Sequence, residues 1–304
     1  MWTTIECAGH PRDLGGMQGA ATRHAIRSEL ARAGLSCSRS RMPTLRGLAS
    51  GPLRGRGAGR EFYRHFAHQA ERLEGLAAAA GVPSDSILAL HLLGPSATGE
   101  VGLLSRGASL RGHWIEEEDA ASLALLERTL PEAVTGEAGW MLRESRPEVG
   151  FPSIEVGLPW LVSSVAGLNA GGLAMMAGPS TTEASGRDGA APALLLVQEC
   201  LQRFSDVEGA LGWCQKRPVE GEQSFVLADA SGAIATVVLD GRECRIEKAE
   251  AEIFLPVGQA NPSNERVAAV SGDVSRLDRI RLDPRRRRLE VDVAGTAIQI
   301  DLKD

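Results

Sequence analysis

A long window without charge is the feature that most constrains the fold of this chain. No charged residue occurs between Glu155 and Glu183, and the segment from Gly157 to Gly178 reads GLPWLVSSVAGLNAGGLAMMAG. About twenty apolar residues in a row can cross a bilayer. In this window, however, prolines, paired serines, an asparagine and several glycines interrupt the apolar residues. We therefore expect the window to lie inside a folded domain and not in a membrane.

Two apolar runs within the window predict a pair of neighbouring strands. The runs extend from Trp160 to Ala166 and from Leu173 to Ala177, and Asn169, Gly171 and Gly172 give a turn signal between them. Neither run alternates between polar and apolar residues. Both faces of these strands are therefore expected to be covered.

Two roles are open for Asn169, which follows the first run. An amide beside glycines can border a pocket and donate a hydrogen bond to a developing oxyanion. Asparagine also adopts the left-handed turn conformation readily. Turn chemistry alone favours this second, local role.

Length and charge exclude several classes of protein. The chain has 304 residues, of which 43% are hydrophobic, so it can bury the core of one large domain or of two ordinary ones. Its net charge of -6 is opposite to the basic footprint of a general nucleic-acid-binding protein. We therefore expect neither a nucleic-acid partner nor a membrane partner, whereas a homodimer is compatible with the sequence.

The cysteines and the first residues indicate an ordinary protein of a reducing compartment. An odd number of cysteines without a CxxC pair predicts neither a disulfide framework nor a zinc site. No phosphate loop, haem motif or metal cluster occurs, so we infer no cofactor. The opening MWTTIECAGHPRD lacks the apolar segment of a signal peptide, which makes the cytoplasm the expected location. The cysteines are Cys7, Cys37, Cys200, Cys214 and Cys244, of which Cys200 and Cys214 lie among apolar neighbours and are expected in the core.

Periodicity predicts helices early in the chain and strands late. The Gly15, Gly16 and Gly19 cluster is expected to lead into the first helix, and residues 34–60, rich in glycine and arginine, are expected to form a loop. His91 is expected to be a partly buried histidine with satisfied hydrogen bonds. The expected helices are Met17–Ala33, Glu61–Ala80 before Gly81, Asp85–Leu93, one from Pro192 and one opened by a capping box at Ser205–Glu208.

The expected strands complete the fold class. Residues Leu123–Leu130 fit a strand and a helix equally well. Two packed antiparallel sheets with helices outside would bury this order of elements, which is an α+β fold. The expected strands are Val101–Leu104 and Ser109–Trp114 as a hairpin, then Ser224–Asp229, Ile234–Asp240, Arg242–Lys248, Arg279–Leu282, Leu289–Val293 and Ile298–Leu302.

Several segments resemble, in order, those of a known enzyme family. They are GHPRDLGGMQGAATRHAI, RLEGLAAAAGVPSDSILALHLL, VAGLNAGGLAMMAG, FVLADASGAIATVVLD and RIRLDPRRRRLEVDVAG. The chain is similar to the isopenicillin N acyltransferase (acyl-coenzyme A:penicillin acyltransferase) family of N-terminal nucleophile (Ntn) hydrolases. The resemblance implies one domain, residues 1–304, with a four-layer αββα sandwich. Residues 1–95 would be a helical part corresponding to the family's small chain, and residues 96–304 would form the sandwich.

The resemblance also implies an active site, which this sequence alters. Family members cut their own chain to expose a cysteine whose free amine is the general base for acyl hydrolysis or transfer. Here Ser96, Ala97 and Thr98 occupy the slot of that cysteine. The sequence keeps the tryptophan of one further family motif and the asparagine of another, but it lacks the two histidines of the latter. The implied catalytic residues are Thr98, Ser96, Asn169 and Asn261, and the implied substrate-pocket residues are Trp114 and Trp160.

Two functions follow from this altered site. In the first, an active amidohydrolase or acyltransferase cuts itself before Thr98, or before Ser96, and acts on a small-molecule amide or thioester. In the second, the chemistry has been lost and the sandwich serves as a binding or scaffold protein. The second explains the missing cysteine, the missing histidines and a shortened segment after Asn261 with a single cause.

Overall fold

The computed structural model describes most of the chain. The described residues are 3–38, 54–97, 109–117, 120–134, 139–178, 191–217, 219–220, 223–240, 243–249, 253–255, 276–293 and 295–303.

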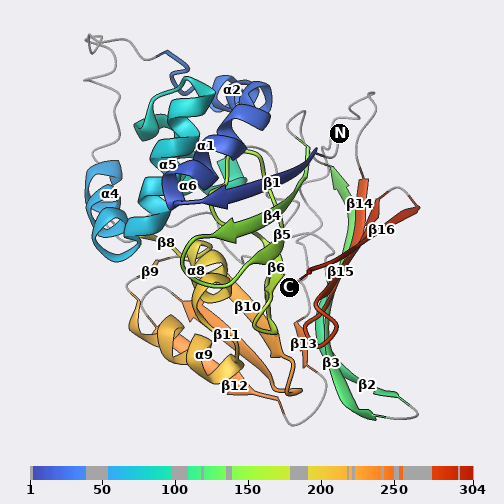
Figure 1. Cartoon of the computed structure of the whole chain (residues 1–304). Helices are drawn as coiled ribbons and strands as arrows, with labels where there is room; N and C mark the ends of the chain where they lie inside the picture. Colours follow the sequence, from blue (N-terminus) through green and yellow to red (C-terminus); the bar gives the residue numbers. More distant parts are fainter. Residues whose placement is uncertain are drawn as a thin grey trace, which may run out of the picture.

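Among these residues, eight strands form the larger of two main sheets (Figure 1). Neighbouring strands are antiparallel except for β1 and β4, which are parallel. The N-terminal part is therefore not helical alone, because β1 supplies one edge of this sheet. In sheet order the strands are β1 (Thr3–Gly9), β4 (Met141–Pro147), β5 (Ser153–Gly157), β6 (Ala166–Asn169), β7 (Leu173–Ala177), β10 (Gln223–Asp229), β11 (Ile234–Asp240) and β12 (Glu243–Lys248).

The smaller main sheet is antiparallel and packs against one face of the larger sheet (Figure 1). At the packed faces a Cβ on Gly112 would lie 2.8 Å from Ile234 Cγ2 and 3.1 Å from Val226 Cγ1. A separate parallel pair joins β8 (Ala191–Pro192) to β9 (Val219–Glu220). In sheet order the strands of the smaller sheet are β13 (Ile253–Leu255), β2 (Ser109–Glu117), β3 (Ala120–Val134), β14 (Arg276–Asp283), β15 (Arg288–Val293) and β16 (Thr296–Asp301).

The helices lie on the opposite side of the larger sheet (Figure 1). Helix α8 packs on β6 and β7, α9 on β10 to β12, and α1 on β1 and β4. The predicted α+β class with two packed sheets is confirmed. The helices are α1 (Pro11–Ala21), α2 (Arg23–Arg32), α4 (Arg54–His65), α5 (Ala67–Ala80), α6 (Ser84–Ala97), α8 (Leu195–Arg203) and α9 (Val207–Lys216).

The outer face of the smaller sheet carries a row of alternating charge. The strand register aligns Arg111 with Glu127, Glu127 with Arg281, and Arg281 with Glu290. An ion pair of 3.7 Å joins Arg281 to Glu290, and both side chains are about one-third exposed. Opposite charges on neighbouring strands suit a sheet face that meets water. Within the described part of the chain, every extensive helix–sheet contact is made to the larger sheet or to the β8–β9 pair.

The charge-free window forms strands in only part of the predicted range. Strand β7 and the turn before it agree with the prediction, and Gly172 adopts φ +90° there. The first predicted strand is wrong, because β6 begins only at Ala166 and residues 158–165 form a buried irregular segment. Side chains from other elements satisfy the carbonyl groups of this segment, as described below, and so replace the hydrogen bonds of a strand.

The glycines near the N-terminus lie inside a helix instead of leading into one. Helix α1 begins at Pro11, a favoured first position, and ends before Thr22. A Cβ at Gly15 would lie 1.8 Å from the Arg72 carbonyl oxygen, and a Cβ at Gly75 would lie 2.0 Å from the Arg12 carbonyl oxygen. The glycines therefore allow α1 and α5 to cross with their backbones in contact.

Several elements differ in extent or detail from the predictions. Ser109–Glu117 pairs with β3 and β13, and the other half of the predicted hairpin lies outside the described residues. The ambiguous Leu123–Leu130 is part of strand β3. The cap of α9 is Asp206, whose side chain accepts from the Gly209 nitrogen at 2.8 Å. Helix α4 also takes up the end of the predicted 34–60 loop.

Candidate functional site

The segment predicted to hold the nucleophile is only partly described. Thr98 and Asn261 both lie outside the described residues. Ser96 lies in the last turn of α6, which continues to Ala97 and not to Leu93 as predicted. The predicted helix end at Leu93 is therefore wrong, and the strand predicted from Val101 lies outside the described residues. An N-terminal nucleophile needs a free amine on its own residue, which only a cut in the chain before it would provide.

Asn169 uses all of its amide hydrogen atoms within the fold. Its Nδ2 donates to the Leu201 carbonyl oxygen at 2.6 Å and to the Phe204 carbonyl oxygen at 2.7 Å. Its Oδ1 accepts from the Leu173 nitrogen at 2.9 Å, and the residue is fully buried. A primary amide has two hydrogens to donate. Asn169 thus fastens the β6–β7 turn to the end of α8 and has no hydrogen left for a substrate.

The strand register places Asn169 on the helix-covered face of the larger sheet. Asn169 pairs with Ser153 and Ser153 pairs with Ser145, so the three side chains share a face. The two predicted pocket residues lie apart from each other, on different sides of the larger sheet. Trp114 extends from the smaller sheet and donates from Nε1 to the Gly232 carbonyl oxygen at 2.7 Å. Trp160 is fully buried in the irregular segment on the helical side.

His91 is a buried histidine with both ring nitrogens in hydrogen bonds, as predicted. Nδ1 lies 2.8 Å from the Ile87 carbonyl oxygen, and Nε2 accepts from the Val162 nitrogen at 3.1 Å. These partners define a neutral ring that donates from Nδ1. The Trp160 ring stands edge-on to it at 5.4 Å between centroids. Burial lowers the pKa of His91 to about 4, against a smaller opposing effect of the Ile87 hydrogen bond.

This neutral histidine gives a testable pH dependence. Between pH 4 and its ordinary pKa of 6.5, the unfolded chain binds a proton at His91 that the folded chain does not. The contribution of His91 to the unfolding free energy is therefore complete above pH 6.5 and decreases as the pH drops toward 4. We expect His91→Gln to flatten this part of the curve of unfolding free energy against pH. An unchanged slope in His91→Gln would contradict the assignment of a buried, neutral ring.

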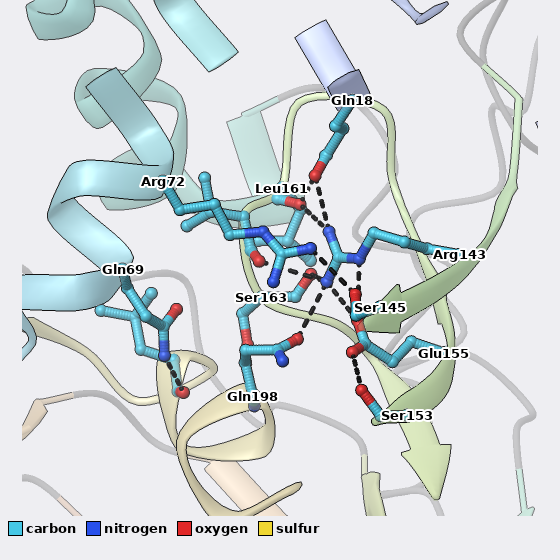
Figure 2. A network of polar contacts seen from close by, with 12 residues as sticks. Gln18, Gln69, Arg72, Arg143, Ser145, Ser153, Glu155, Leu161, Ser163 and Gln198 are labelled. Carbon is cyan, nitrogen blue, oxygen red and sulfur yellow. Dashed lines mark hydrogen bonds and ion pairs between the residues drawn. The ribbon is translucent and has the colours of Figure 1, made fainter. Parts of the chain in front are cut away.

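A buried polar network occupies the helix-covered face of the larger sheet (Figure 2). At its centre is Arg143 of β4, whose side chain is 1% exposed. Arg143 forms an ion pair with Glu155 on the neighbouring strand, in which Nε donates to Oε2 at 2.8 Å. Its Nη1 donates to Gln18 Oε1 at 2.7 Å, and its Nη2 donates to Gln198 Oε1 at 3.0 Å. Arg143 thus joins α1 and α8 to the sheet.

The same network holds the irregular segment at residues 158–165. Arg143 Nη2 donates to the carbonyl oxygens of Val162 at 3.2 Å and Ser163 at 3.0 Å. Gln18 Nε2 donates to the carbonyl oxygens of Pro159 at 3.0 Å and Leu161 at 2.9 Å. These bonds meet the need of buried carbonyl groups for partners. The network therefore holds the irregular segment in place, and the Arg143 guanidinium and Gln18 Nε2 both have acceptors within the fold.

A second arginine makes the network rich in positive charge. Arg72 of α5 is 2% exposed and donates to Ser145 Oγ at 3.1 Å. Burial, and then the charge of Arg143, lower the pKa of Arg72 to about 9. Burial alone would raise the pKa of Glu155, but Arg143, Arg72 and a hydrogen bond from Ser153 together hold it below its ordinary value. One carboxylate thus compensates two guanidinium groups.

One arginine lies between the two main sheets. Arg128 of β3 is 1% exposed, and its Nη1 donates to the Ala177 carbonyl oxygen at 2.6 Å. Burial lowers the pKa of Arg128 to about 10. It shares a cross-strand row with Leu110 and Ile280, so it lies among the apolar side chains of the inner face.

A groove with a volume of about 480 Å³ lies where α1 crosses α5 beside β1, and neither Ser96 nor Asn169 lines it. In the part of the chain that the structure describes, no group of three or more His, Cys, Asp and Glu side chains could hold a metal ion. No helix in these ranges is long and apolar enough to cross a membrane. The groove is lined by Ala8, Arg12, Asp13, Gly16, Met17, Gly75, Ala78 and Ala79.

Sequence reasoning missed the network because its members are far apart in the chain. Gln18, Arg72 and Gln198 come from three helices, and no local pattern connects them. A usable signal was present at Glu155, which lies between the strand-forming residues Ile154 and Val156. A charge buried in such a strand needs a partner of opposite charge.

Comparisons with known proteins find resemblance only at the level of structure. No protein-family model and no curated protein sequence match the chain. Penicillin V acylase from Agrobacterium tumefaciens is 17% identical, with a TM-score of 0.43 over 64% of this chain and 86% of that chain. A mutant form of conjugated bile acid hydrolase from Clostridium perfringens is 9% identical, with a TM-score of 0.43 over 64% and 92%. The N-acylethanolamine-hydrolyzing acid amidase ortholog of Caenorhabditis elegans is 8% identical, with a TM-score of 0.40 over 59% and 93%. Similarity at this level transfers no activity, and the fold assignment rests on the strand pairing described above.

Proposed function

We propose that this chain is a divergent member of the Ntn hydrolase superfamily that has lost acyl-transfer chemistry and acts as a binding or scaffold protein. The ordered sequence motifs and the two packed sheets support the relationship. The slot at Pro95–Gly99 contains no cysteine, and the histidines of the family motif beside Asn261 are absent. A fold can persist when its site is lost, because function depends on particular side chains and not on the architecture.

The observation that carries this proposal is the position of the Asn169 amide. A donor that stabilises an oxyanion must lie about 2.7–3.1 Å from the position of the developing charge. Both Nδ2 hydrogens of Asn169 are instead held by carbonyl oxygens at the end of α8. Turning the amide toward a substrate would leave two buried carbonyl groups without these partners. The arrangement favours a structural role for this residue.

The structural role of Asn169 predicts a loss of stability on substitution. Asn169→Asp keeps the size of the side chain but places a carboxylate against the Leu201 and Phe204 carbonyl oxygens. We expect the unfolding free energy to fall by at least about 2 kcal/mol, because buried groups lose their partners. Urea denaturation measures this loss, with the exposed-site variant Gln215→Glu as the control. Wild-type stability in Asn169→Asp would show that the amide is not needed for folding.

An activity screen tests the proposed function. Purified protein is assayed against fluorogenic amides and thioesters of varied acyl groups, beside the Thr98→Ala and Ser96→Ala variants. We expect no turnover above the buffer blank for any of the three proteins. Turnover that is abolished by Thr98→Ala or Ser96→Ala would overturn the proposal in favour of an active amidohydrolase or acyltransferase with that residue as the nucleophile.

A further inference from the structure

Two buried cysteines face each other across the α8–α9 pair. Cys200 of α8 and Cys214 of α9 are 0% and 1% exposed. Their Sγ atoms are 3.8 Å apart. Helix α8 ends at Arg203 and α9 begins at Val207, so a short connection holds the two helices together. The chain thus keeps two thiol groups in contact within its core.

The separation of the sulfur atoms is short enough for a bond to form after a small movement. A disulfide has an S–S length of about 2.05 Å, so the sulfurs must approach by about 1.8 Å. The pair therefore differs from Cys37 and Cys244, which are only partly buried.

We propose that Cys200 and Cys214 form a disulfide when the chain folds under oxidising conditions, with a small-molecule disulfide such as oxidised glutathione as the oxidant. A thiolate of one cysteine attacks the oxidant, which gives a mixed disulfide and releases one small thiol. The second cysteine then attacks the protein sulfur and releases the second small thiol. Two protein thiols are oxidised to one S–S bond, and one small disulfide is reduced to two thiols.

The bond should form during folding and be protected afterwards. The thiolate is the reactive form of cysteine. In the folded chain, the hydrogen bond with Cys214 and burial raise the pKa of the Cys200 thiol. The sealed pair consequently reacts slowly with oxidants, and a bond already made is equally shielded from reductants.

The position of the pair gives the bond a structural consequence. Asn169 donates to the carbonyl oxygen of Leu201, the residue after Cys200, and to that of Phe204 in the α8–α9 connection. A bond between Cys200 and Cys214 would fix this connection, and with it the attachment of the β6–β7 turn. This inference is independent of the proposed function.

Thiol counting and peptide mapping test the proposal on the full chain. Protein is produced once in a reducing and once in an oxidising bacterial cytoplasm, then denatured in N-ethylmaleimide and weighed intact. We expect five adducts for the reduced protein, one for each cysteine. The oxidised protein should carry two fewer, and non-reducing digestion should give one linked pair of peptides containing Cys200 and Cys214. The linked protein should melt about 5 °C higher, as estimated for a closed loop of about 15 residues.

Two results would overturn the proposal. One is five adducts on protein that folded under oxidising conditions. The other is a linked peptide that contains Cys244 in place of Cys200 or Cys214. As a matched control, Cys244→Ser should keep the bond and Cys214→Ser should abolish it. If Cys214→Ser does not fold, the peptide map of the wild-type chain decides alone.

Discussion

Glu155→Gln is expected to lower the free energy of unfolding by about 3–5 kcal/mol, which is the cost of breaking a buried ion pair by removing one partner. The Glu155 side chain is fully buried and forms an ion pair with Arg143, and Ser153 Oγ donates to its other oxygen at 2.5 Å. Without the carboxylate, Arg143 and Arg72 would remain buried beside each other with no negative charge from this strand. Chemical denaturation followed by circular dichroism measures the loss.

Arg72→Met is the matched control for Glu155→Gln. Because Arg72 is the surplus cation of the network, methionine removes an uncompensated buried charge and retains much of the side-chain volume. We expect the unfolding free energy of Arg72→Met to stay within about 1 kcal/mol of the wild type, in line with the replacement of buried charges by apolar groups. Equal losses in the two variants would contradict this distribution of charge.

The Arg143–Glu155 ion pair also makes the stability of the protein depend on pH in the acid range. The pKa of Glu155 lies below its ordinary value of 4.5 in the folded chain. The folded state therefore binds fewer protons there than the unfolded state. The contribution of the pair is complete above pH 4.5 and is lost as the pH falls through the lowered value. In Glu155→Gln, residue 155 should no longer contribute to the fall of the unfolding free energy below pH 4.5.

Gly15→Ala is expected to destabilise the protein by about 3 kcal/mol or more, at the upper end of overpacking costs. Its Cβ would overlap the Arg72 carbonyl oxygen at 1.8 Å, and a backbone atom cannot rotate away as a side chain can. Helix α5 would have to move away from α1. That movement would also shift Arg72, so we expect both the α1–α5 packing and the buried polar network to be disrupted. A thermal melt detects the change.

Gly16→Ala provides the comparison within the same helix. Apart from the adjacent residues and the backbone of its own helix, no atom lies within 4 Å of the Cβ that Gly16 would gain. Alanine is favoured over glycine inside a helix by about 1 kcal/mol, so we expect Gly16→Ala to match or exceed wild-type stability. A similar loss in both variants would show that helix flexibility, and not the crossing, decides the effect.

Local signals predicted the parts of the fold that local interactions determine. Strands β10, β11 and β12 lie where the sequence predicted them, and Gly232 adopts φ +96° in the turn between β10 and β11. Gly81 ends α5 with φ +72°, as the sequence indicated. Residues 158–165 were predicted wrongly because their conformation depends on Arg143 and Gln18, which are distant in the sequence. Composition reveals that this segment is buried but not which partners its carbonyl groups find.

The candidate site was harder to predict than the fold. Asn169 was identified as a residue of interest, but the sequence could not show that the end of α8 takes both of its amide hydrogens. The sequence predicts a helix that ends at Leu93, before Ser96, whereas α6 continues to Ala97. Only the strand register in the structure shows that Asn169 faces the helices, whereas Trp114 extends from the other sheet.

The intact mass of the purified protein tests most directly whether this chain retains Ntn chemistry. Self-processing is the step that would give Thr98 the free amine it needs as a base. We expect a single species with the mass of the uncut chain, about 32.2 kDa, after prolonged incubation at neutral pH. Two fragments that meet between Ala97 and Thr98 would contradict the proposed loss of catalysis and would establish Thr98 as an N-terminal nucleophile.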